Sequence, residues 1–274
     1  MIVVLNTYIP NFRGKRKNSD QKVIANTAAG DIACYTTQVD PDVMYDESCS
    51  FAPQSSLSGA EWRPCFNDRL TMFIAGAPGA GKSYLAKHMI NLLPANLPIL
   101  LFTALEENDG NFDDLGKDRL FKIKMQPDIL SSISLAEIRK RAGTNQIILL
   151  FDDVDKIRES KVQNAVFSIM NDALANGRGH EKHDGKGDIH VICTSHSAND
   201  YQKTKYTFEN SNYVALFPGS TPVLQMQRMF DKLGLGKDLC MYLMQQSRAQ
   251  KFRSVIIHKI VPMYIIFGNQ IMLL

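Results

Sequence analysis

The feature that most constrains this chain is a glycine-rich loop followed by Lys82 and Ser83, which fits the phosphate-binding pattern G-x-x-x-x-G-K-S/T. The apolar stretch Leu70–Ala75 before the loop predicts a strand, and apolar residues at helical spacing after it, up to Leu93, predict a helix. The loop glycines let successive backbone N–H groups turn toward the β- and γ-phosphates, and the following helix adds the positive end of its dipole. We therefore expect a nucleotide site at this loop.

The pattern assigns separate roles to the residues of the loop. Lys82 is expected to reach the β- and γ-phosphate oxygens of ATP, and the Ser83 hydroxyl is expected to be a ligand of Mg²⁺. The residues predicted to bind the nucleotide are Gly76, Ala77, Pro78, Gly79, Ala80, Gly81, Lys82, Ser83 and the following Tyr84. The competing interpretation is a structural glycine turn.

A second stretch, Gln146–Asp153, is fully apolar until it ends in Asp152 and Asp153. This pattern is typical of a central parallel strand and of the Walker B motif. Because parallel strands present their carboxyl ends at one edge of the sheet, Asp152 is expected beside Ser83, where it would complete the Mg²⁺ shell. Asp153 would orient or deprotonate the attacking water. The alternative is that the two acids only end the strand.

A third apolar stretch, Ile189–His196, predicts another buried strand whose polar end lies at the same edge. In ATPases with a strand inserted between the phosphate-loop strand and the Walker B strand, a polar residue at this position senses the γ-phosphate. His196 is the candidate for that role. The alternative is a structural histidine.

Composition and charge exclude little. The chain has 274 residues, 45% of them hydrophobic, and a net charge of +3, which permits contact with nucleic acid without arguing for it. Its five cysteines are odd in number and contain no C-x-x-C pair, so we expect reduced thiols in an intracellular compartment. No run of about 18 apolar residues is present, and we therefore expect no membrane span.

The chain is expected to divide at residue 68. Residues 1–68 combine a short apolar start, the basic run Arg13–Lys17 and an acidic cluster, and they predict a poorly ordered or accessory N-terminal extension. The basic run is interpreted as a solvated loop or as an arm that contacts DNA or a capsid. Residues 69–274 form the predicted P-loop ATPase domain, an α/β domain that ends in a hairpin turning at Gly268 and Asn269.

The order of these motifs resembles the genome-packaging ATPases of large double-stranded DNA viruses and virophages, the poxvirus-type branch of the FtsK/HerA superfamily. The phosphate loop alone is shared with many unrelated NTPases. More specific are Thr194-Ser195-His196, Asp200-Tyr201 with the Lys203–Lys205 segment, the Phe-Pro segment Leu216–Gly219 and the closing strand pair. The resemblance covers roughly residues 70–274.

The resemblance implies a RecA-like P-loop NTPase fold with a central, mostly parallel sheet and helices on both faces. It implies a homo-oligomeric ring, usually a hexamer, that hydrolyses ATP at subunit interfaces and moves double-stranded DNA into a capsid, with a capsid or portal protein as partner. The host-cell cytoplasm, at the viral factory, and the virion are the implied locations. Candidate DNA contacts are Lys182, Lys186, Lys203 and Lys205.

The resemblance also implies an arginine finger that reaches the neighbouring subunit's nucleotide, and Arg178 matches its position before the sensor strand. Arg253 is a second candidate for the finger. The chain departs from the family in three places: an insertion follows Arg178, the usual Walker B glutamate is Asp153, and the sensor position, often Gln, is His196. The catalytic set predicted from sequence is therefore Lys82, Asp153, Arg178 and His196.

Two other classes remain open. A small-molecule kinase with a P-loop is disfavoured by the apolar strand ending in two acids, by the sensor-like strand and by the lack of an arginine-rich lid. An AAA+-like loader or assembly factor would use ATP only as a switch. Such a protein should carry a helical C-terminal lid, whereas this chain is predicted to end in strands.

Overall fold

The structure, a computed structural model, describes residues 2–5, 21–27, 30–37, 69–104, 110–142, 146–179, 188–197, 201–248, 253–260, 263–267 and 270–273. The chain divides into two compact units. One comprises Met1–Asn67 together with Ile257–Leu274, and the other comprises Asp68–Ile256. The division of the chain into an extension and an ATPase domain at residue 68 stays a prediction.

The first unit contains two sets of antiparallel strands. Strand β3 (Gly30–Thr37) pairs with both β1 (Ile2–Leu5) and β2 (Gln21–Thr27), and none of these three strands was predicted from the sequence. Strands β11 (Tyr264–Phe267) and β12 (Gln270–Leu273) form the predicted C-terminal hairpin, which is confirmed. Its expected turn at Gly268 and Asn269, like the basic run Arg13–Lys17, lies outside the described residues.

The second unit contains a parallel sheet in the order β9-β4-β8-β7-β5-β6, in which every neighbouring pair runs parallel. Its strands are β4 (Thr71–Ala75), β5 (Ile99–Thr103), β6 (Leu120–Lys122), β7 (Ile147–Asp152), β8 (Ile189–Ser195) and β9 (Tyr213–Leu216). Strand β10 (Val255–His258) lies next to β9. Strands β7 and β8 are buried at every residue, which explains why their sequences are mostly apolar rather than alternating, with His190 as the polar exception before the polar carboxyl ends.

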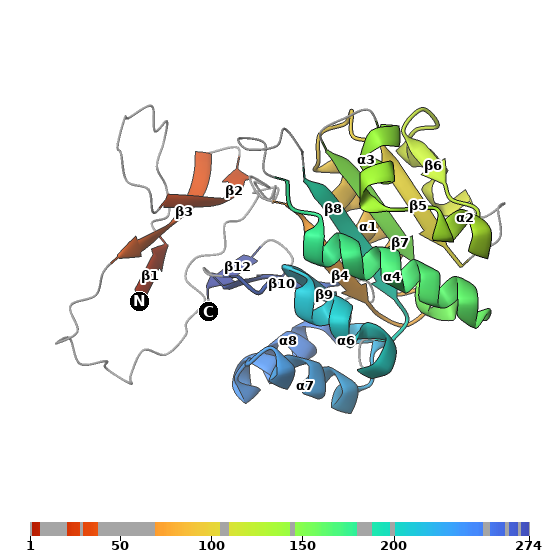
Figure 1. Ribbon diagram of the computed structural model, residues 1–274. Coiled ribbons are helices and arrows are strands. Elements are labelled where there is room, and N and C mark those ends of the chain that lie inside the picture. The colour runs from red at the N-terminus through yellow and green to blue at the C-terminus, as the bar shows by residue number, and fades with distance from the viewer. Residues whose placement is uncertain are drawn as a thin grey trace. The chain divides into compact units, whose positions relative to one another are not determined.

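Helices cover both faces of this sheet (Figure 1). They are α1 (Lys82–Asn91), α2 (Pro127–Ser131), α3 (Leu135–Ala142), α4 (Ser160–Asn176), α6 (Tyr201–Asn210), α7 (Val223–Lys232) and α8 (Lys237–Arg248). Short 3₁₀ turns occur at η1 (Gly110–Leu115), η2 (Val154–Lys156) and η3 (Pro218–Ser220). Helices α2, α3 and α6 all contact α4, which lies across the front of the sheet in Figure 1. The predicted RecA-like P-loop NTPase fold, with a mostly parallel sheet and helices on both faces, is confirmed.

The strand order creates a switch point between β4 and β8. The connection through α1 runs from β4 toward β5, whereas the connection through α6 runs from β8 in the opposite direction, to β9. Because such crossovers are right-handed, α1 and α6 must lie on opposite faces of the sheet. The loops that follow β4 and β8 therefore diverge at their carboxyl ends, which is where open α/β sheets bind ligands.

Two helix starts test whether capping residues can be predicted from the local sequence. Ser134 and Glu137 have the spacing of a capping box, which predicts a helix start at Ser134, and the Glu137 backbone N–H does donate to the Ser134 hydroxyl over 3.2 Å. The sequence also predicts that Ser220 or Thr221 caps the next helix, with Pro222 in its first turn. This prediction is wrong: Pro222 occupies the cap position of α7, and no side chain caps this helix. A proline provides the fixed φ angle that suits a helix start without any hydroxyl.

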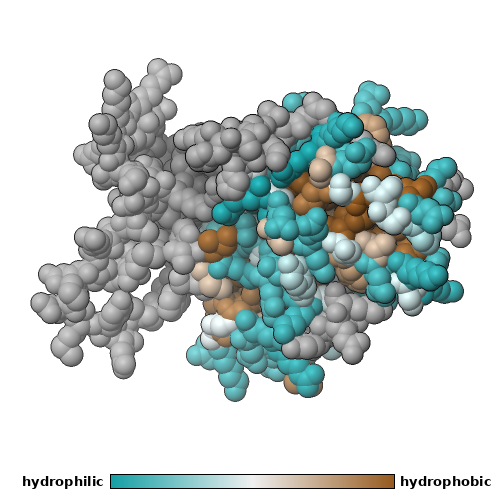
Figure 2. Space-filling view, in the orientation of Figure 1, coloured by the Kyte–Doolittle hydropathy of each residue, from teal (hydrophilic) through white to brown (hydrophobic). Residues whose placement is uncertain are grey.

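Hydrophilic residues cover much of the described surface on the face drawn in Figure 2, and hydrophobic residues show between them in patches. Within the described part of the chain, no helix combines the length and the apolar character needed to cross a membrane.

Arg69 joins the start of β4 to the end of α4. Its guanidinium donates to the backbone oxygens of Ala173, Leu174 (3.1 Å) and Ile189 (2.7 Å). Burial lowers the pKa of Arg69 to about 10, although Asp188 opposes this shift. The last carbonyls of a helix have no partner within the helix, so a cation at this position satisfies them and complements the helix dipole.

His190 is a buried titratable group in the centre of the sheet. It is only 4% exposed, and its Nδ1 accepts a hydrogen bond from the Leu70 backbone N–H over 3.0 Å. An imidazole that accepts at Nδ1 carries its proton on Nε2 and is neutral. Burial is the main cause that lowers the pKa of His190 from 6.5 to about 4.

This geometry predicts a pH-dependent loss of stability. In the unfolded chain His190 takes up a proton near pH 6.5, whereas the folded chain resists protonation until about pH 4. The free energy of unfolding should therefore fall as the pH drops from 6.5 toward 4, by on the order of 3 kcal/mol from this group. Urea denaturation at a series of pH values measures it. His190→Asn keeps an acceptor near the Leu70 N–H, and its free energy of unfolding should not show this fall. If stability depends on pH in the same way in both proteins, His190 is not its cause.

A second prediction concerns Gly76, which lies at the carboxyl end of β4. A Cβ atom at this position would come within 2.9 Å of Cδ2 of the buried Phe217. Gly76→Ala should therefore lower the free energy of unfolding by about 1–3 kcal/mol through overpacking. Adding Phe217→Leu should restore part of that loss, which a double-mutant cycle detects.

The matched control for this prediction is Gly236→Ala. No described atom lies within 4 Å of a Cβ at Gly236, and we expect a change below about 1 kcal/mol. If the Gly76 and Gly236 variants lose equal free energy of unfolding, the close approach of Phe217 does not contribute to the loss at Gly76.

Candidate functional site

The predicted phosphate loop connects β4 directly to α1, which begins at Lys82. Gly79 and Gly81 have φ angles of 72° and 99°, in the left-handed region that residues with a side chain rarely adopt. The Gly76 N–H donates to the Ser195 carbonyl over 3.1 Å, which extends the pairing of β4 with β8 into the loop. The loop therefore has the strand-turn-helix context that a phosphate-binding loop requires.

Lys82 and Asp153 lie together at the switch point. The Lys82 Nζ is 3.7 Å from Oδ1 of Asp153, and the two side chains are 5% and 13% exposed. A nearly buried ammonium and a nearly buried carboxylate stabilise each other's charge. The structure thus brings the predicted phosphate-binding lysine to the residue that was predicted to position water.

His196 contacts the same carboxylate from β8. Its Nε2 is 2.6 Å from Oδ2 of Asp153. Strand β8 lies between β4 and β7, so the expected insertion of the sensor strand between the phosphate-loop and Walker B strands is confirmed. The two oxygens of Asp153 therefore face two different side chains, Lys82 and His196.

Thr194 joins the two acids, and sequence reasoning did not select it. Its hydroxyl is 2.7 Å from Oδ1 of Asp152 and 3.3 Å from Oδ1 of Asp153, and it accepts the Asp153 backbone N–H over 2.9 Å. Thr194 is completely buried. The sequence signal for Thr194 was its place in the polar end of a buried strand, two residues before His196. That end has three consecutive polar residues, and the sequence alone does not identify which of them faces the acids.

The backbone at Asp153 explains how neighbouring acids reach one hydroxyl. Successive side chains of a strand point to opposite faces of the sheet. Asp153 instead has φ 49° and ψ 33°, and it is the only residue other than glycine with a positive φ in the described part of the chain. This left-handed conformation ends β7 and brings the carboxylates of Asp152 and Asp153 to the same side chain.

The acids affect groups nearby. Asp155 lies in η2, and burial, followed by repulsion from Asp153, raises its pKa. Cys193 is a buried free thiol whose pKa is raised well above its ordinary value, mainly by burial and further by Asp155, Asp152 and Asp153. The thiol is therefore held protonated and unreactive.

The residues present fit a magnesium ion. Within the described ranges, no group of three or more His, Cys, Asp or Glu side chains is arranged to hold a metal. Mg²⁺ does not need such a group, because it binds through one or two protein oxygens and completes its shell with phosphates and waters. Asp152, which is 1% exposed, would supply a carboxylate, and Ser83 on the first turn of α1 would supply a hydroxyl. These two roles stay predictions.

Other predicted residues lie apart from this cluster or outside the description. Tyr84 follows Ser83 in α1 and is 77% exposed. Lys205 is exposed and lies 3.8 Å from Glu209, whereas Lys182 and Lys186 lie outside the described residues, as does the side chain of Lys203.

Arg178 lies at the opposite edge of the sheet. It follows Gly177, whose carbonyl accepts a hydrogen bond from the N–H of Ile189, the first residue of β8. His196 follows the last residue of β8, so the length of this strand, roughly 20 Å, separates the two positions. The exposed Arg178 is therefore not part of the site formed by Lys82 and Asp153 in its own chain. Arg253, the second finger candidate, is half-buried and precedes β10.

Comparison with known proteins gives three kinds of similarity. Residues 72–213 match the model of the ATPase family associated with various cellular activities (AAA). The chain is 28% identical over 207 residues to protein V3 of Sputnik virophage, an alignment that covers 73% of this chain and 76% of that protein.

Two solved structures are also similar. One is the genome packaging NTPase B204 from Sulfolobus turreted icosahedral virus 2 in complex with AMP, with a TM-score of 0.46, 14% identity and coverage of 73% of this chain and 96% of that chain. The other is B204, the DNA-packaging ATPase from Sulfolobus turreted icosahedral virus, with a TM-score of 0.42, 14% identity and coverage of 68% and 91%.

The family match covers more than half of the chain and includes the phosphate loop, both aspartates of the Walker B strand and the strand that carries Thr194 and His196. The terminal strands that were weighed against an AAA+-like protein lie after the matched segment, so they do not exclude membership. This chain belongs to the ATPase family associated with various cellular activities (AAA).

Proposed function

We propose that this ATPase is a DNA translocase that packages viral double-stranded DNA into capsids and hydrolyses ATP at the subunit interfaces of a ring. The observation that carries the proposal is the separation of Arg178 from Lys82 and Asp153 along the full length of β8. An exposed arginine at that edge can complete a nucleotide site only in a neighbouring subunit. The relative from Sputnik virophage supports a viral context.

In this mechanism Lys82 binds the β- and γ-phosphate oxygens, and the loop N–H groups hold the phosphate chain. Mg²⁺, held by Ser83 and Asp152, would neutralise charge on the phosphates. Asp153 orients the attacking water and accepts its proton as the new bond to the γ-phosphorus forms and the bond to the leaving oxygen of ADP breaks. His196, which contacts Asp153 over 2.6 Å, would sense whether the γ-phosphate is present.

The neighbouring subunit would supply the remaining charge. Arg178 neutralises the transferring phosphoryl group, a contribution worth about 10³–10⁵ in rate in related mechanisms. Hydrolysis then changes the subunit interface and moves loops along the DNA backbone, with an affinity dominated by phosphate contacts. A hexameric ring, a capsid or portal partner, and location at the viral factory in the host cytoplasm and in the virion complete the proposal.

The first prediction from this proposal concerns turnover. Duplex DNA should stimulate ATP hydrolysis, and added salt should reduce that stimulation because phosphate contacts release counterions. Lys82→Ala should abolish turnover, and Asp153→Asn should lower it by about 10²-fold or more. Phosphate release with and without duplex DNA measures these effects.

The matched control is Lys87→Ala, which removes a lysine on the same helix that pairs with Asp114 over 2.9 Å, away from the site. It should leave turnover within about twofold of the native chain, since a surface ion pair contributes little. A phosphorylated small-molecule product would indicate a kinase instead. If duplex DNA neither binds to the chain nor changes its turnover, the chain would instead be a protein-remodelling ATPase.

The second prediction concerns the shared site. Arg178→Ala alone should lower turnover by about 10³-fold or more, and mixing it with Asp153→Asn subunits should restore activity. Mixed interfaces then combine an intact Asp153 from one chain with an intact Arg178 from the other. Arg228→Ala, which changes an exposed arginine on α7, is the control and should stay active. Rescue by Arg253→Ala subunits in place of Arg178→Ala subunits would assign the finger to Arg253, and no rescue by either would remove the shared-site mechanism.

A further inference from the structure

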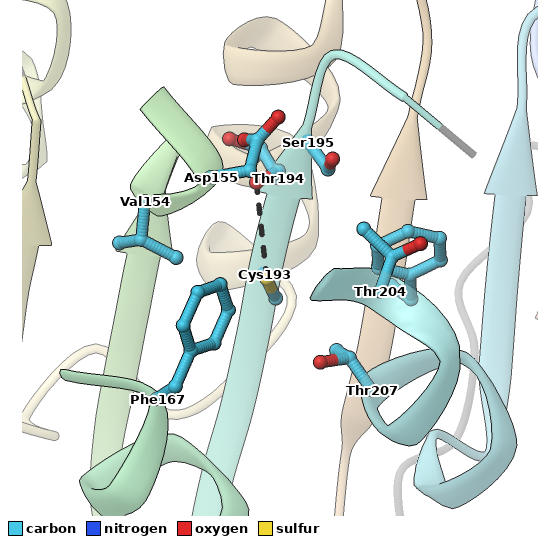
Figure 3. A pocket seen from close by; sticks show the side chains of 9 residues that line it. Val154, Asp155, Phe167, Cys193, Thr194, Ser195, Thr204 and Thr207 are labelled. Atoms are coloured by element: carbon cyan, nitrogen blue, oxygen red, sulfur yellow. Dashed lines mark hydrogen bonds between the residues drawn. The ribbon is translucent and has the colours of Figure 1, made fainter. Parts of the chain in front are cut away.

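The hydroxyl of Thr194 contacts the carboxylates of both Asp152 and Asp153. It comes from the sixth residue of the seven-residue strand β8, where the strand reaches the switch point. Figure 3 shows Thr194 at this end of β8, with Asp155 beside it and Cys193 one residue earlier on the strand.

The hydrogen-bonding capacity of a hydroxyl decides how these contacts are shared. A threonine has one O–H donor and two acceptor lone pairs. One lone pair accepts the Asp153 N–H over 2.9 Å, and the single proton is donated to Oδ1 of Asp152, the closer carboxylate at 2.7 Å. A donor bonded to a charged carboxylate makes a short, strong hydrogen bond, and this one is fully buried.

Each of these bonds restrains a different acid. The bond to Oδ1 fixes the rotation of the Asp152 carboxylate. Because the carboxylate is planar, its other oxygen, Oδ2, is then held in one direction as well. The bond from the Asp153 N–H supports a left-handed backbone, which costs an aspartate on the order of 1 kcal/mol. That backbone aims the Asp153 carboxylate at Lys82 and His196.

We propose that Thr194 is a positioning residue for ATP hydrolysis: one hydroxyl holds Asp152 for the metal and Asp153 for the water. The role rests on the proposed function, because it assigns a task to each acid. Groups that orient the residues around a metal typically contribute about 10- to 100-fold to metal affinity or activity. We expect an effect of that size.

Three substitutions test the role. Thr194→Val removes the hydroxyl and keeps the branched shape, whereas Thr194→Ser keeps the hydroxyl and removes the methyl group. The matched control is Thr207→Val, because Thr207 is also a buried threonine that lines the same small pocket, while its hydroxyl lies 3.8 Å from the sulfur of Met170 and contacts no acid. If activity falls only because a buried hydroxyl has been removed, Thr207→Val should show the same fall as Thr194→Val.

The first readout is kinetic. Thr194→Val should lower kcat by about 10- to 100-fold and raise the Mg²⁺ concentration needed for half-maximal turnover by a similar factor, with a smaller change in KM for ATP. Thr194→Ser should stay within about threefold of the native chain, and Thr207→Val should match the native chain in both quantities.

The second readout needs no nucleotide. Loss of the acceptor should speed amide hydrogen exchange at Asp153 in Thr194→Val, and Thr194→Ser should restore its protection. Native turnover and native exchange in Thr194→Val would overturn this inference and leave the proposed function intact. A native chain that does not hydrolyse ATP at all would overturn the proposed function and this role together.

Discussion

Two adjacent carboxylates at the end of β7 are largely removed from water, and such groups are tolerated only where cations and donors surround them. Lys82 comes from α1, Thr194 comes from β8, and His196 directly follows β8. These elements meet at the end of β7 because β8 lies between β4 and β7, with all carboxyl ends at one edge. The strand order therefore brings to the buried acids the side chains that stabilise their charges, and the geometry of the site follows from this order.

The left-handed residue after β7 is the second condition for the site. Without it, Asp152 and Asp153 would point to opposite faces of the sheet, as neighbours in a strand do. With it, they face one hydroxyl and yet retain different surroundings: Asp152 is almost fully buried, and Asp153 faces the loop lysine and the histidine. Two identical side chains thus acquire the different environments that their proposed roles in metal binding and water activation require.

The sequence predicted the strands that carry the site, because a strand buried on both faces must be continuously apolar and its first polar residues mark the edge. It also predicted that the two acids would lie at the same edge as the phosphate loop, but not the specific approach of Lys82 to Asp153. It did not identify Thr194, because which of three consecutive polar residues faces the acids depends on register with β7. The short α2 and η1 were missed, since brief elements leave no measurable periodicity. The longer β2 and β3 were missed because their sequences mix polar and apolar residues and lack the apolar run of the central strands. The failed cap of α7 reflects Pro222, whose ring fixes the helix start that a hydroxyl was expected to provide.

Arg69 gives the sheet a mechanical property. It lies two residues before β4, the strand that leads into the phosphate loop, and its guanidinium donates to carbonyls in the last turn of α4 and to the first residue of β8. Strand β4 is paired on both sides, with β8 and β9, so it behaves as a stiff rod. One end of this strand leads into the phosphate loop, and the other end is tied through Arg69 to the last turn of α4, just before Arg178. In the ring that we propose, β4 would therefore link the phosphate loop of one site directly to the arginine offered to the next site.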